Sequence, residues 1–569
     1  MLRDPMGFRL TRRTFVAGTI ASALLVACGG DDEDDTPAAT ATSEGSTGAE
    51  STATTAESGA EATATEAPAE STSTEEAEAE PTEESQPAAT DAELVIGHNV
   101  DPTTLNPVDT TSASFQSIFA QIVEQLMIFD SDGATIQPWL AESYEWVDDV
   151  TLDLTLKQGV EFSNGEPFNA ECVKFTLDQF TASTKFQFFL PVDVYKETEV
   201  IDDYTARVHL QRPFAPFLGF LARSVSALPP AYYQEVALEG FGQKPIGTGP
   251  FMLDEWVKDS HIKLIRNDAY WDGSHPIATV TYRIIPEPVA RIAAFEAGEV
   301  QIASYLTTDA VKRLENSDTV DVMVSPGLRK YATHFDTNSA DAATLMDPRV
   351  RKALNHAVDK QAIAEQVFQG AAVPMKGQWQ VEQEPGFNPD IQEFAYDPDL
   401  AKQLLAEAGF ADGFDMQLTY TAGNSPLEKE LGEIVASYLQ QVGVRVSQRF
   451  LEYGAFLTAR TESSLGTHQW GLLLPPEPHF NYALFIDGSI YSFHSVGERF
   501  TELVDEGTRT TDQAARAEIY SEAAQIMHDD PPMLYLIVPQ DIHGVSKKVQ
   551  GFNPRVDQVL WLYDVSVKA

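Results

Sequence analysis

Cys28 is the residue whose surroundings most clearly predict a chemical reaction. It follows the small and apolar residues Leu25-Val26-Ala27 and precedes Gly29. Small residues leading into a cysteine are typical of the cleavage box at which bacteria remove a signal peptide and attach a lipid to the thiol. We therefore expect lipidation at Cys28, with the remainder of the chain outside the cytoplasm and tied to the cell membrane.

The segment before Cys28 has the features of an export signal. Arg12 and Arg13 are adjacent and precede an apolar stretch that runs from Phe15 to Val26. As a helix this stretch would span about 18 Å, whereas the hydrocarbon core of a bilayer is about 30 Å thick. It is therefore too short to stay as a membrane span, and the paired arginines indicate a twin-arginine signal over residues 1–27.

Residues 28–91 read as a tether. From Asp31 to Asp91 the chain is almost wholly Thr, Ala, Ser, Pro, Gly and Glu, and it holds 18 acidic residues with no Lys or Arg. Low hydrophobicity and charge of one sign favour a disordered, extended chain. Such a coil would reach roughly 40–50 Å, which lets a globular body move above the membrane.

The remaining residues carry no signature of catalysis. We find no Gly-x-Ser-x-Gly elbow, no His-Glu-x-x-His pair and no reactive cysteine paired with histidine, so we expect neither an enzyme nor a cofactor. Cys172 is the only other cysteine, which excludes a disulfide framework, and we expect it to be a small buried residue near a helix start. His468, His479 and His494 lie in one stretch, but their spacing matches no metal-ligand motif.

The net charge of the protein restricts the class of molecule that it is expected to bind. The formal net charge is −48, and the chain stays acidic when the tether is set aside. Phosphate binding needs clustered Lys and Arg, so nucleic acid is disfavoured.

Hydrophobic periodicity predicts an α/β body. Residues 151–156 and 204–210 alternate polar and apolar as half-buried strands do, and 113–126 carries an apolar stripe at helical spacing. Two later segments repeat one pattern, a helix ended by glycine and followed by a strand. They are 398–408 with Gly409 and strand 414–420, and 426–442 with Gly443 and strand 444–450. This alternation favours an open, largely parallel sheet.

Several motifs together resemble the extracytoplasmic solute-binding proteins of ABC importers, in the peptide/nickel-binding class called family 5. The resemblance extends over nearly all of residues 92–569. Its most specific blocks are Pro245-Ile246-Gly247-Thr248-Gly249-Pro250-Phe251, Trp256 and Arg266-Asn267-Asp268-Ala269-Tyr270-Trp271-Asp272-Gly273, with support from 138–143, 157–168, 335–338, 347–354, 396–398 and 407–410.

The resemblance implies a periplasmic-binding-protein-like type II fold, with two lobes joined by a hinge and an extra subdomain inserted in the first lobe. The implied divisions are 92–128, 248–333 and 533–569 for lobe I, 129–247 for the inserted subdomain, and 334–532 for lobe II. We expect strands that cross between the lobes near 331–338 and 533–538. Gly247 and Gly249 suit a tight turn at positive φ, and Trp256, Tyr270 and Trp271 are expected to be packing residues.

The same resemblance implies a ligand site between the lobes. Peptide binders of the family hold the ligand amine with an aspartate that closely follows a tryptophan, but the matching stretch from Trp470 to Glu477 has no aspartate. A buried ammonium without a carboxylate is unfavourable by several kcal/mol, which puts the usual dipeptide clamp in doubt. Glu477 could substitute from a shifted loop. The predicted ligand-binding residues are Thr103, Thr104, Asn106, Tyr331, His334, Trp379, Trp470, Leu472, Glu477, His479, Tyr491 and Phe493.

The leading hypothesis is therefore a monomeric, lipid-anchored protein that captures a peptide or similar small organic solute, closes its lobes around it and delivers it to an ABC permease in the membrane. Nickel-chelate or oligosaccharide binding in the same fold is an alternative. A surface module that senses solute and signals to a membrane partner is an alternative of another class, and a neighbouring permease gene would distinguish it.

Overall fold

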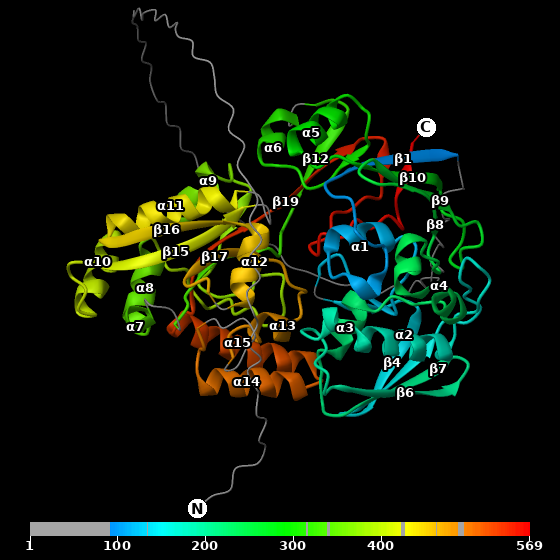
Figure 1. Ribbon diagram of the computed structural model, residues 1–569, viewed down its shortest axis with the longest axis horizontal. Helices are drawn as coiled ribbons and strands as arrows, with labels where there is room; N and C mark the ends of the chain where they lie inside the picture. The colour runs from blue at the N-terminus through cyan, green and yellow to red at the C-terminus, as the bar shows by residue number, and fades with distance from the viewer. Residues whose placement is uncertain are drawn as a thin grey trace, which may run out of the picture. The chain divides into compact units, whose positions relative to one another are not determined.

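The computed structural model describes residues 91–133, 135–314, 317–337, 342–422, 427–462, 464–486 and 494–568. All of them belong to one compact unit, Glu83–Ala569, which is mixed α/β with three main sheets (Figure 1). Among these residues no helix combines the length and the apolar character that crossing a bilayer requires. The predictions for Arg12, Arg13, Cys28 and the tether fall outside the described residues.

A seven-stranded sheet organises the first lobe. β1 lies at its middle, parallel to β10 and β11, and the remaining pairs in the sheet are antiparallel. Strands from both ends of the chain therefore meet in this lobe. In spatial order the strands are β12 (Val320–Ser325), β19 (Asp541–Ser546), β11 (Ile302–Ala303), β1 (Ala92–His98), β10 (Ile277–Ile284), β9 (His261–Arg266) and β8 (Phe251–Val257), and the helices are α1 (Ala113–Phe119), α5 (Pro288–Glu296) and α6 (Asp309–Leu314).

A four-stranded antiparallel sheet lies within the stretch predicted as the inserted subdomain. The strands predicted at 151–156 and 204–210 are confirmed as β5 and β7, which pair with each other and turn Leu152 and Leu154 into a core continuous with that of the first lobe. In spatial order the strands are β4 (Ala141–Asp148), β5 (Thr151–Leu156), β7 (Thr205–Leu210) and β6 (Tyr195–Asp202), with the hairpin β2 (Met127–Phe129) and β3 (Ile136–Pro138) and the helices α2 (Ala170–Ala182), α3 (Phe217–Ser224) and α4 (Pro230–Gln243). Cys172 is buried in the first turn of α2, as predicted.

A six-stranded sheet forms the second lobe. β15 and β16 are parallel, but β13 runs antiparallel to β17 and β18, so the sheet is mixed and not largely parallel. The two predicted helix-glycine-strand units are confirmed. The strands in spatial order are β14 (Ala372–Pro374), β18 (Met533–Pro539), β13 (Lys330–His334), β17 (His468–Leu472), β15 (Phe414–Ala422) and β16 (Val444–Glu452).

Nine helices, α7 to α15, belong to the described part of the second lobe. The first of the predicted units shows how the sequence ends a helix: Asp397 accepts a hydrogen bond from Leu400 N at 2.8 Å to begin α10, and Gly409 follows its end at φ 93°. Gly443 does the same after α11, at φ 95°. The helices are α7 (Ala342–Leu345), α8 (Pro348–His356), α9 (Lys360–Gln366), α10 (Pro398–Glu407), α11 (Glu428–Gln441), α12 (Tyr453–Thr461), α13 (Pro478–Tyr482), α14 (Glu498–Arg509) and α15 (Gln513–Asp529).

Within the described residues, the chain crosses between the lobes twice. Residues 326–329 join β12 of the first lobe to β13 of the second, and Gln540 joins β18 to β19, which runs toward the first lobe (Figure 1). The two crossings run side by side, because a side chain at Gly327 would contact the carbonyl oxygen of Pro539. The predicted crossing strands are therefore β13 and β18, and the crossovers themselves lie just before the first and just after the second.

Two local expectations need correction. α1 ends at Phe119, and the apolar stripe that predicted helix to residue 126 continues through turns. The carbonyl of Ile122 is thereby free to accept a hydrogen bond from Gly249 N at 2.9 Å. Gly247 and Gly249 do not adopt positive φ; glycine is needed there because a side chain at either position would collide with the backbone of residues 121–123.

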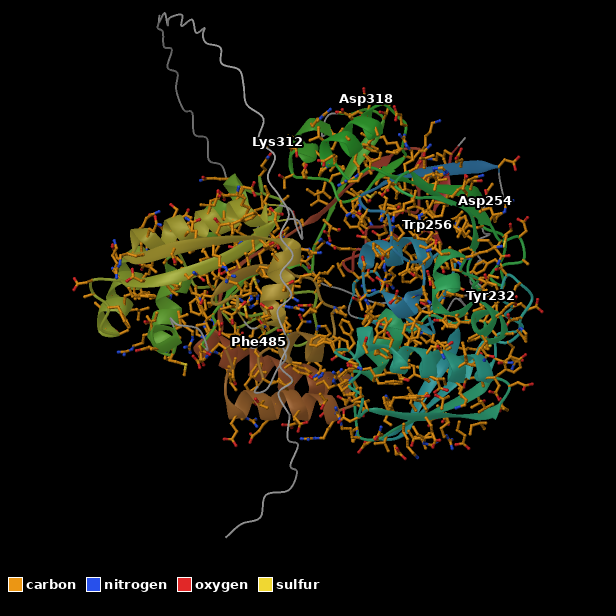
Figure 2. All side chains as sticks on the ribbon, in the orientation of Figure 1. Tyr232, Asp254, Trp256, Lys312, Asp318 and Phe485 are labelled. Carbon is orange, nitrogen blue, oxygen red and sulfur yellow. The ribbon has the colours of Figure 1, made fainter. Side chains whose placement is uncertain are left out.

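The aromatic residues of the family-like motifs pack as predicted. Glu124 is buried and accepts hydrogen bonds from the side chains of Trp139, Tyr270 and Trp271, each at 2.9 Å. Burial raises the pKa of Glu124, and these donors partly oppose the rise. Trp256 donates to Asp101 at 2.9 Å and lies on the first lobe (Figure 2). These side chains fix the loop that holds Gly247 and Gly249 against the turns after α1.

Candidate functional site

A cavity of about 480 Å³, here called the interlobe cavity, is lined by residues of both lobes and of the inserted subdomain. Its volume lies within the range of about 300–1,000 Å³ that is typical of small-ligand sites. Its lining includes Ser112, Arg223, Arg329, Trp470, Leu472 and Asp557.

The first-lobe wall is held by local caps. Asn106 is fully buried and accepts a hydrogen bond from Val108 N at 3.0 Å, which begins the short 3-10 helix Pro107–Asp109. Its amide group donates to Tyr233 Oη at 3.0 Å and so joins this wall to α4. Ser112 then caps α1 by accepting from Phe115 N. The wall is therefore rigid on both sides of Pro107.

The second-lobe wall is the end of β17. Gly471 packs so closely on the ring of Tyr331 that an added Cβ would lie 3.0 Å from the ring edge. Its carbonyl oxygen accepts a hydrogen bond from Arg329 Nη1 at 3.3 Å. The neighbouring Trp470 is only 5% exposed, and Arg460 lies over its ring at 4.9 Å. Its indole N–H is enclosed and has no hydrogen-bond partner among the described residues, and Trp470 lines the cavity.

Positive charge gathers at this cavity although the protein is acidic overall. Arg223, at the end of α3, forms no ion pair with any described residue, and burial lowers its pKa. Arg329 likewise has no carboxylate within ion-pair distance among the described residues. Arg223 comes from the inserted subdomain and Arg329 from the crossing segment, so two guanidinium groups from different parts of the fold line one cavity.

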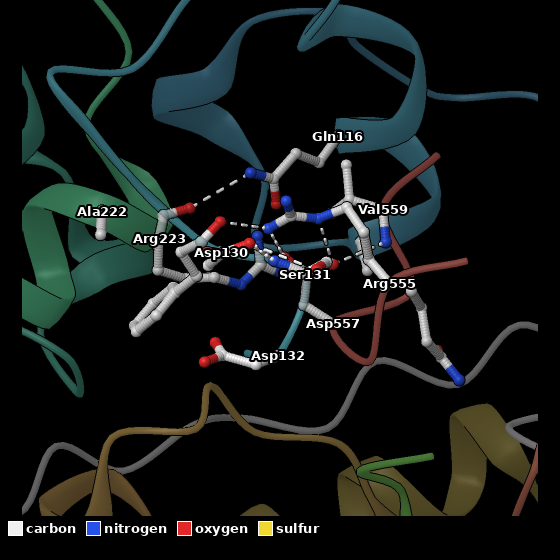
Figure 3. A network of polar contacts seen from close by, with 12 residues as sticks. Gln116, Asp130, Ser131, Asp132, Ala222, Arg223, Arg555, Asp557 and Val559 are labelled. Atoms are coloured by element: carbon white, nitrogen blue, oxygen red, sulfur yellow. Dashed lines mark hydrogen bonds and ion pairs between the residues drawn. The ribbon is translucent and has the colours of Figure 1, made fainter. Parts of the chain in front are cut away.

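Among the described residues, the one carboxylate that lines the interlobe cavity already has an ion-pair partner. Asp557 accepts a hydrogen bond from Arg555 Nη2 at 2.9 Å, and Arg555 also donates to the carbonyl of Phe129 at 2.7 Å. Burial alone would raise the pKa of Asp557, but Arg555 lowers it overall, so the group stays ionised. Figure 3 shows this network beside Arg223, whose carbonyl accepts from Gln116 Nε2 at 3.3 Å.

Three predicted site residues line cavities. Trp470 and Leu472 line the interlobe cavity, and Tyr331 lines a second cavity described below. Thr104 and Asn106 lie beside α4, and neither they nor Thr103 line the cavity.

Other predicted site residues are packed in the second lobe. Trp379 is fully buried, with its ring 5.6 Å from that of His334 and 5.7 Å from that of Phe485, and its Nε1 donates to Asn481 at 3.0 Å. Burial lowers the pKa of His334, so this ring is neutral at pH 7.

Glu477 and His479 lie at the start of α13. Glu477 caps the helix and forms a buried ion pair with Arg516, whose Nη1 lies 3.2 Å from Glu477 Oε2. The ring of His479 packs edge-on against Phe214, and burial lowers its pKa to about 3. Tyr491 and Phe493 lie outside the described residues. The ligand-binding roles of all these residues stay predictions.

The charged residues that line the interlobe cavity, Arg223 and Arg329, were not among those predicted from the sequence. Arg223 lies in the last turn of an apolar helix and Arg329 precedes a strand, and neither belongs to a recognisable motif. The position of Arg329 directly before a predicted crossing strand was the one available signal. Within the described ranges, no group of three His, Cys, Asp or Glu side chains is arranged to hold a metal ion directly.

Comparison with known proteins identifies the family. Residues 135–492 match the model of the bacterial extracellular solute-binding proteins, family 5. The glutathione-binding protein GsiB of Salmonella paratyphi A is 28% identical over 493 residues, which cover 82% of this chain and 92% of GsiB.

Two solved structures share the fold. The periplasmic binding protein DppA from Helicobacter pylori, in complex with the peptide STSA, superposes with a TM-score of 0.73 at 25% identity, covering 84% of this chain and 98% of DppA. NikA from Brucella suis, in complex with Fe(III)-EDTA, superposes with a TM-score of 0.75 at 25% identity, covering 84% of this chain and all of NikA.

Proposed function

Because this chain belongs to the bacterial extracellular solute-binding proteins of family 5, we propose that it captures a peptide or similar small solute that carries a carboxylate. Proteins of this family have a type II periplasmic binding protein fold and serve ABC importers. The solute lies in the interlobe cavity and is delivered to an ABC permease. The observation that carries this proposal is the pair of guanidinium groups, Arg223 and Arg329, which line that cavity and form no ion pair with any carboxylate of the described residues.

The charge pattern favours an anionic group on the solute. Guanidinium groups bind carboxylates through paired, charge-assisted hydrogen bonds, and such bonds strengthen where water is excluded. Asp557 attracts Arg223 electrostatically, but its hydrogen-bonded ion-pair partner is Arg555. The indole N–H of Trp470 adds a neutral donor for a carbonyl oxygen of the solute. A peptide supplies both a carboxylate and carbonyl acceptors.

The capture of the solute follows from which parts of the fold contribute residues to the interlobe cavity. The first-lobe wall, the inserted subdomain and the second-lobe wall all contact the cavity, so a solute there gains contacts from every part only when the lobes are together. Differential binding to the closed state is what shifts a two-state equilibrium toward closure. The closed form would then dock on the permease, while the lipid anchor at Cys28 and the tether keep the protein beside it.

Titration calorimetry with the full-length chain tests the proposal. The probes are trialanine, glutathione and the uncharged trisaccharide maltotriose. We expect saturable binding of trialanine or glutathione and none of maltotriose. Arg223→Gln should weaken peptide binding roughly 10- to 100-fold, as loss of a charged hydrogen bond does. Arg283→Gln is the matched control, because Arg283 pairs with Glu299 at 2.9 Å away from the cavity. Binding of maltotriose alone, or equal peptide binding by Arg223→Gln, would contradict the proposal.

A chelate that carries carboxylates is the second candidate. NikA from Brucella suis was solved with Fe(III)-EDTA, a chelate of this kind, and the same two arginines suit such a ligand. Adding Fe(III)-EDTA to the same titrations separates the two, because chelate binding without peptide binding would favour this candidate.

A further inference from the structure

A second cavity of about 480 Å³ lies where the chain crosses between the lobes, and we call it the crossing cavity. Ser114, Arg329 and Gln558 line both this cavity and the interlobe cavity, so the two adjoin across these residues. Apolar side chains from both lobes form much of the remaining wall. Among them are Leu306, Ile542, Tyr331, Phe368 and Leu427.

The crossing cavity carries hydrogen-bond acceptors that lack donors. Asp541, the first residue of β19, accepts a hydrogen bond from Gln558 Nε2 at 2.5 Å through Oδ1, but its enclosed Oδ2 has no partner among the described residues. The side-chain oxygen of Asn99 is also enclosed and lacks a partner in the described part of the chain. Both residues line the cavity. A buried carboxylate without its full set of donors is unfavourable.

The nearby cations do not satisfy this carboxylate. Arg291 is buried and donates to four backbone carbonyls, those of Ile285, Pro286, Ser304 and Tyr305. Arg329 donates to Gly471 on the far side of the shared wall and forms no ion pair with Asp541. Burial accordingly raises the pKa of Asp541 to about 7, against smaller lowering effects of Gln558 and Arg329, and Asp557 adds to the rise.

Backbone strain concentrates around the same cavity. Tyr305, Leu427 and Gln558 have φ of 53°, 61° and 66°, a left-handed conformation that residues other than glycine rarely adopt. All three line the crossing cavity. Strained residues of this kind persist where the surroundings hold them, and they cluster at ligand clamps. The strain therefore marks the cavity as a constructed site and not as loose packing.

We propose that the crossing cavity is a second subsite, in which Asp541 and Asn99 bind the protonated amine of the solute whose carboxylate lies at Arg223 and Arg329. This inference rests on the proposed function. The carboxylate partner of the amine is then Asp541 on β19, whereas the stretch after Trp470 has no aspartate and its Glu477 is paired with Arg516. The shared wall of Ser114, Arg329 and Gln558 then lies beneath the middle of the solute, and the ammonium neutralises a carboxylate that the protein leaves unpaired.

Calorimetry with blocked amines tests the subsite in the full-length chain. The probes are trialanine with N-acetyltrialanine, and glutathione with N-acetylglutathione. We expect the unmodified chain to prefer the free amine by roughly 100-fold, as removal of one partner of a buried charge pair predicts. Asp541→Asn should abolish that preference by weakening only the free-amine probe. Asn99→Ala, which keeps the carboxylate, should reduce the preference. Asp321→Asn, a matched change at an exposed position of β12, should leave it unchanged.

The outcomes separate the two proposals. Peptide binding with an amine preference that survives Asp541→Asn, or equal loss of free and blocked probes in that variant, would overturn the subsite while the proposed function stands. If neither probe of either pair binds the unmodified chain, the proposed function itself fails and the subsite fails with it.

Discussion

The enclosed carboxylate of Asp541 predicts a specific dependence of stability on pH. Its pKa is about 7 in the folded protein, whereas an aspartate in an unfolded chain has a pKa of about 3.9. Ionisation therefore favours the unfolded state. The stability that protonated Asp541 contributes is complete below about pH 4 and is lost as the pH rises through 7.

The magnitude follows from the two pKa values. Linkage gives a loss of about 1.5 kcal/mol at pH 5 and about 4 kcal/mol at pH 8, which is a difference of about 2.5 kcal/mol across this range. Asparagine has nearly the same shape and does not ionise. The free energy of unfolding of Asp541→Asn, relative to that of the unmodified chain, should therefore rise by about 2.5 kcal/mol between pH 5 and pH 8.

Urea unfolding followed by tryptophan fluorescence at pH 5 and pH 8 provides the assay. Comparing variant with unmodified chain at each pH cancels the contributions of all other titrating groups. Asp321→Asn removes an exposed carboxylate of the same sheet, and its difference from the unmodified chain should not change over this pH range. A difference for Asp541→Asn that is equally independent of pH would refute the argument that burial raises the pKa of this carboxyl group.

Three further perturbations test other parts of the account. Cys28→Ala should release the exported protein from membranes, and continued membrane retention would count against the anchor. Arg516→Met leaves Glu477 buried without its ion-pair partner, so it should destabilise the protein by about 3–5 kcal/mol in a denaturant titration. The double variant with Glu477→Gln should recover most of that loss. No recovery would contradict the ion-pair argument. Gly247→Ala should lower stability by about 1–3 kcal/mol through collision with the backbone of Ile122, whereas Gly454→Ala, in a helix with open space around it, should not; equal effects would contradict the packing explanation.

Local patterns predicted local structure well. The helix that ends at Gly409 and the strand that follows it were evident from sequence, because apolar spacing and a glycine cap act over a few residues. The strands at 151–156 and 204–210 were equally evident. The extension of α1 to residue 126 failed because tertiary hydrogen bonds from Gly249 override the helical period of that stretch.

Long-range features escaped the sequence. The need for glycine at 247 arises from backbone 125 residues away, so the pattern indicated the residue type correctly but the reason wrongly. The positions of Arg223, Arg329 and Asp541 also depend on long-range structure. They line two adjoining cavities only because the chain has crossed twice between the lobes. No sequence motif marks these residues, because what each can bind depends on which side chains the fold leaves beyond hydrogen-bonding or ion-pair distance.

The central claim is that a solute with a carboxylate is held between the two lobes. The decisive measurement is a crystal structure of the full-length chain with the peptide that binds most tightly in calorimetry. We expect the peptide carboxylate to contact Arg223 and Arg329, with further contacts from both lobes. A peptide bound on an outer surface, or one that touches a single lobe and neither arginine, would contradict it.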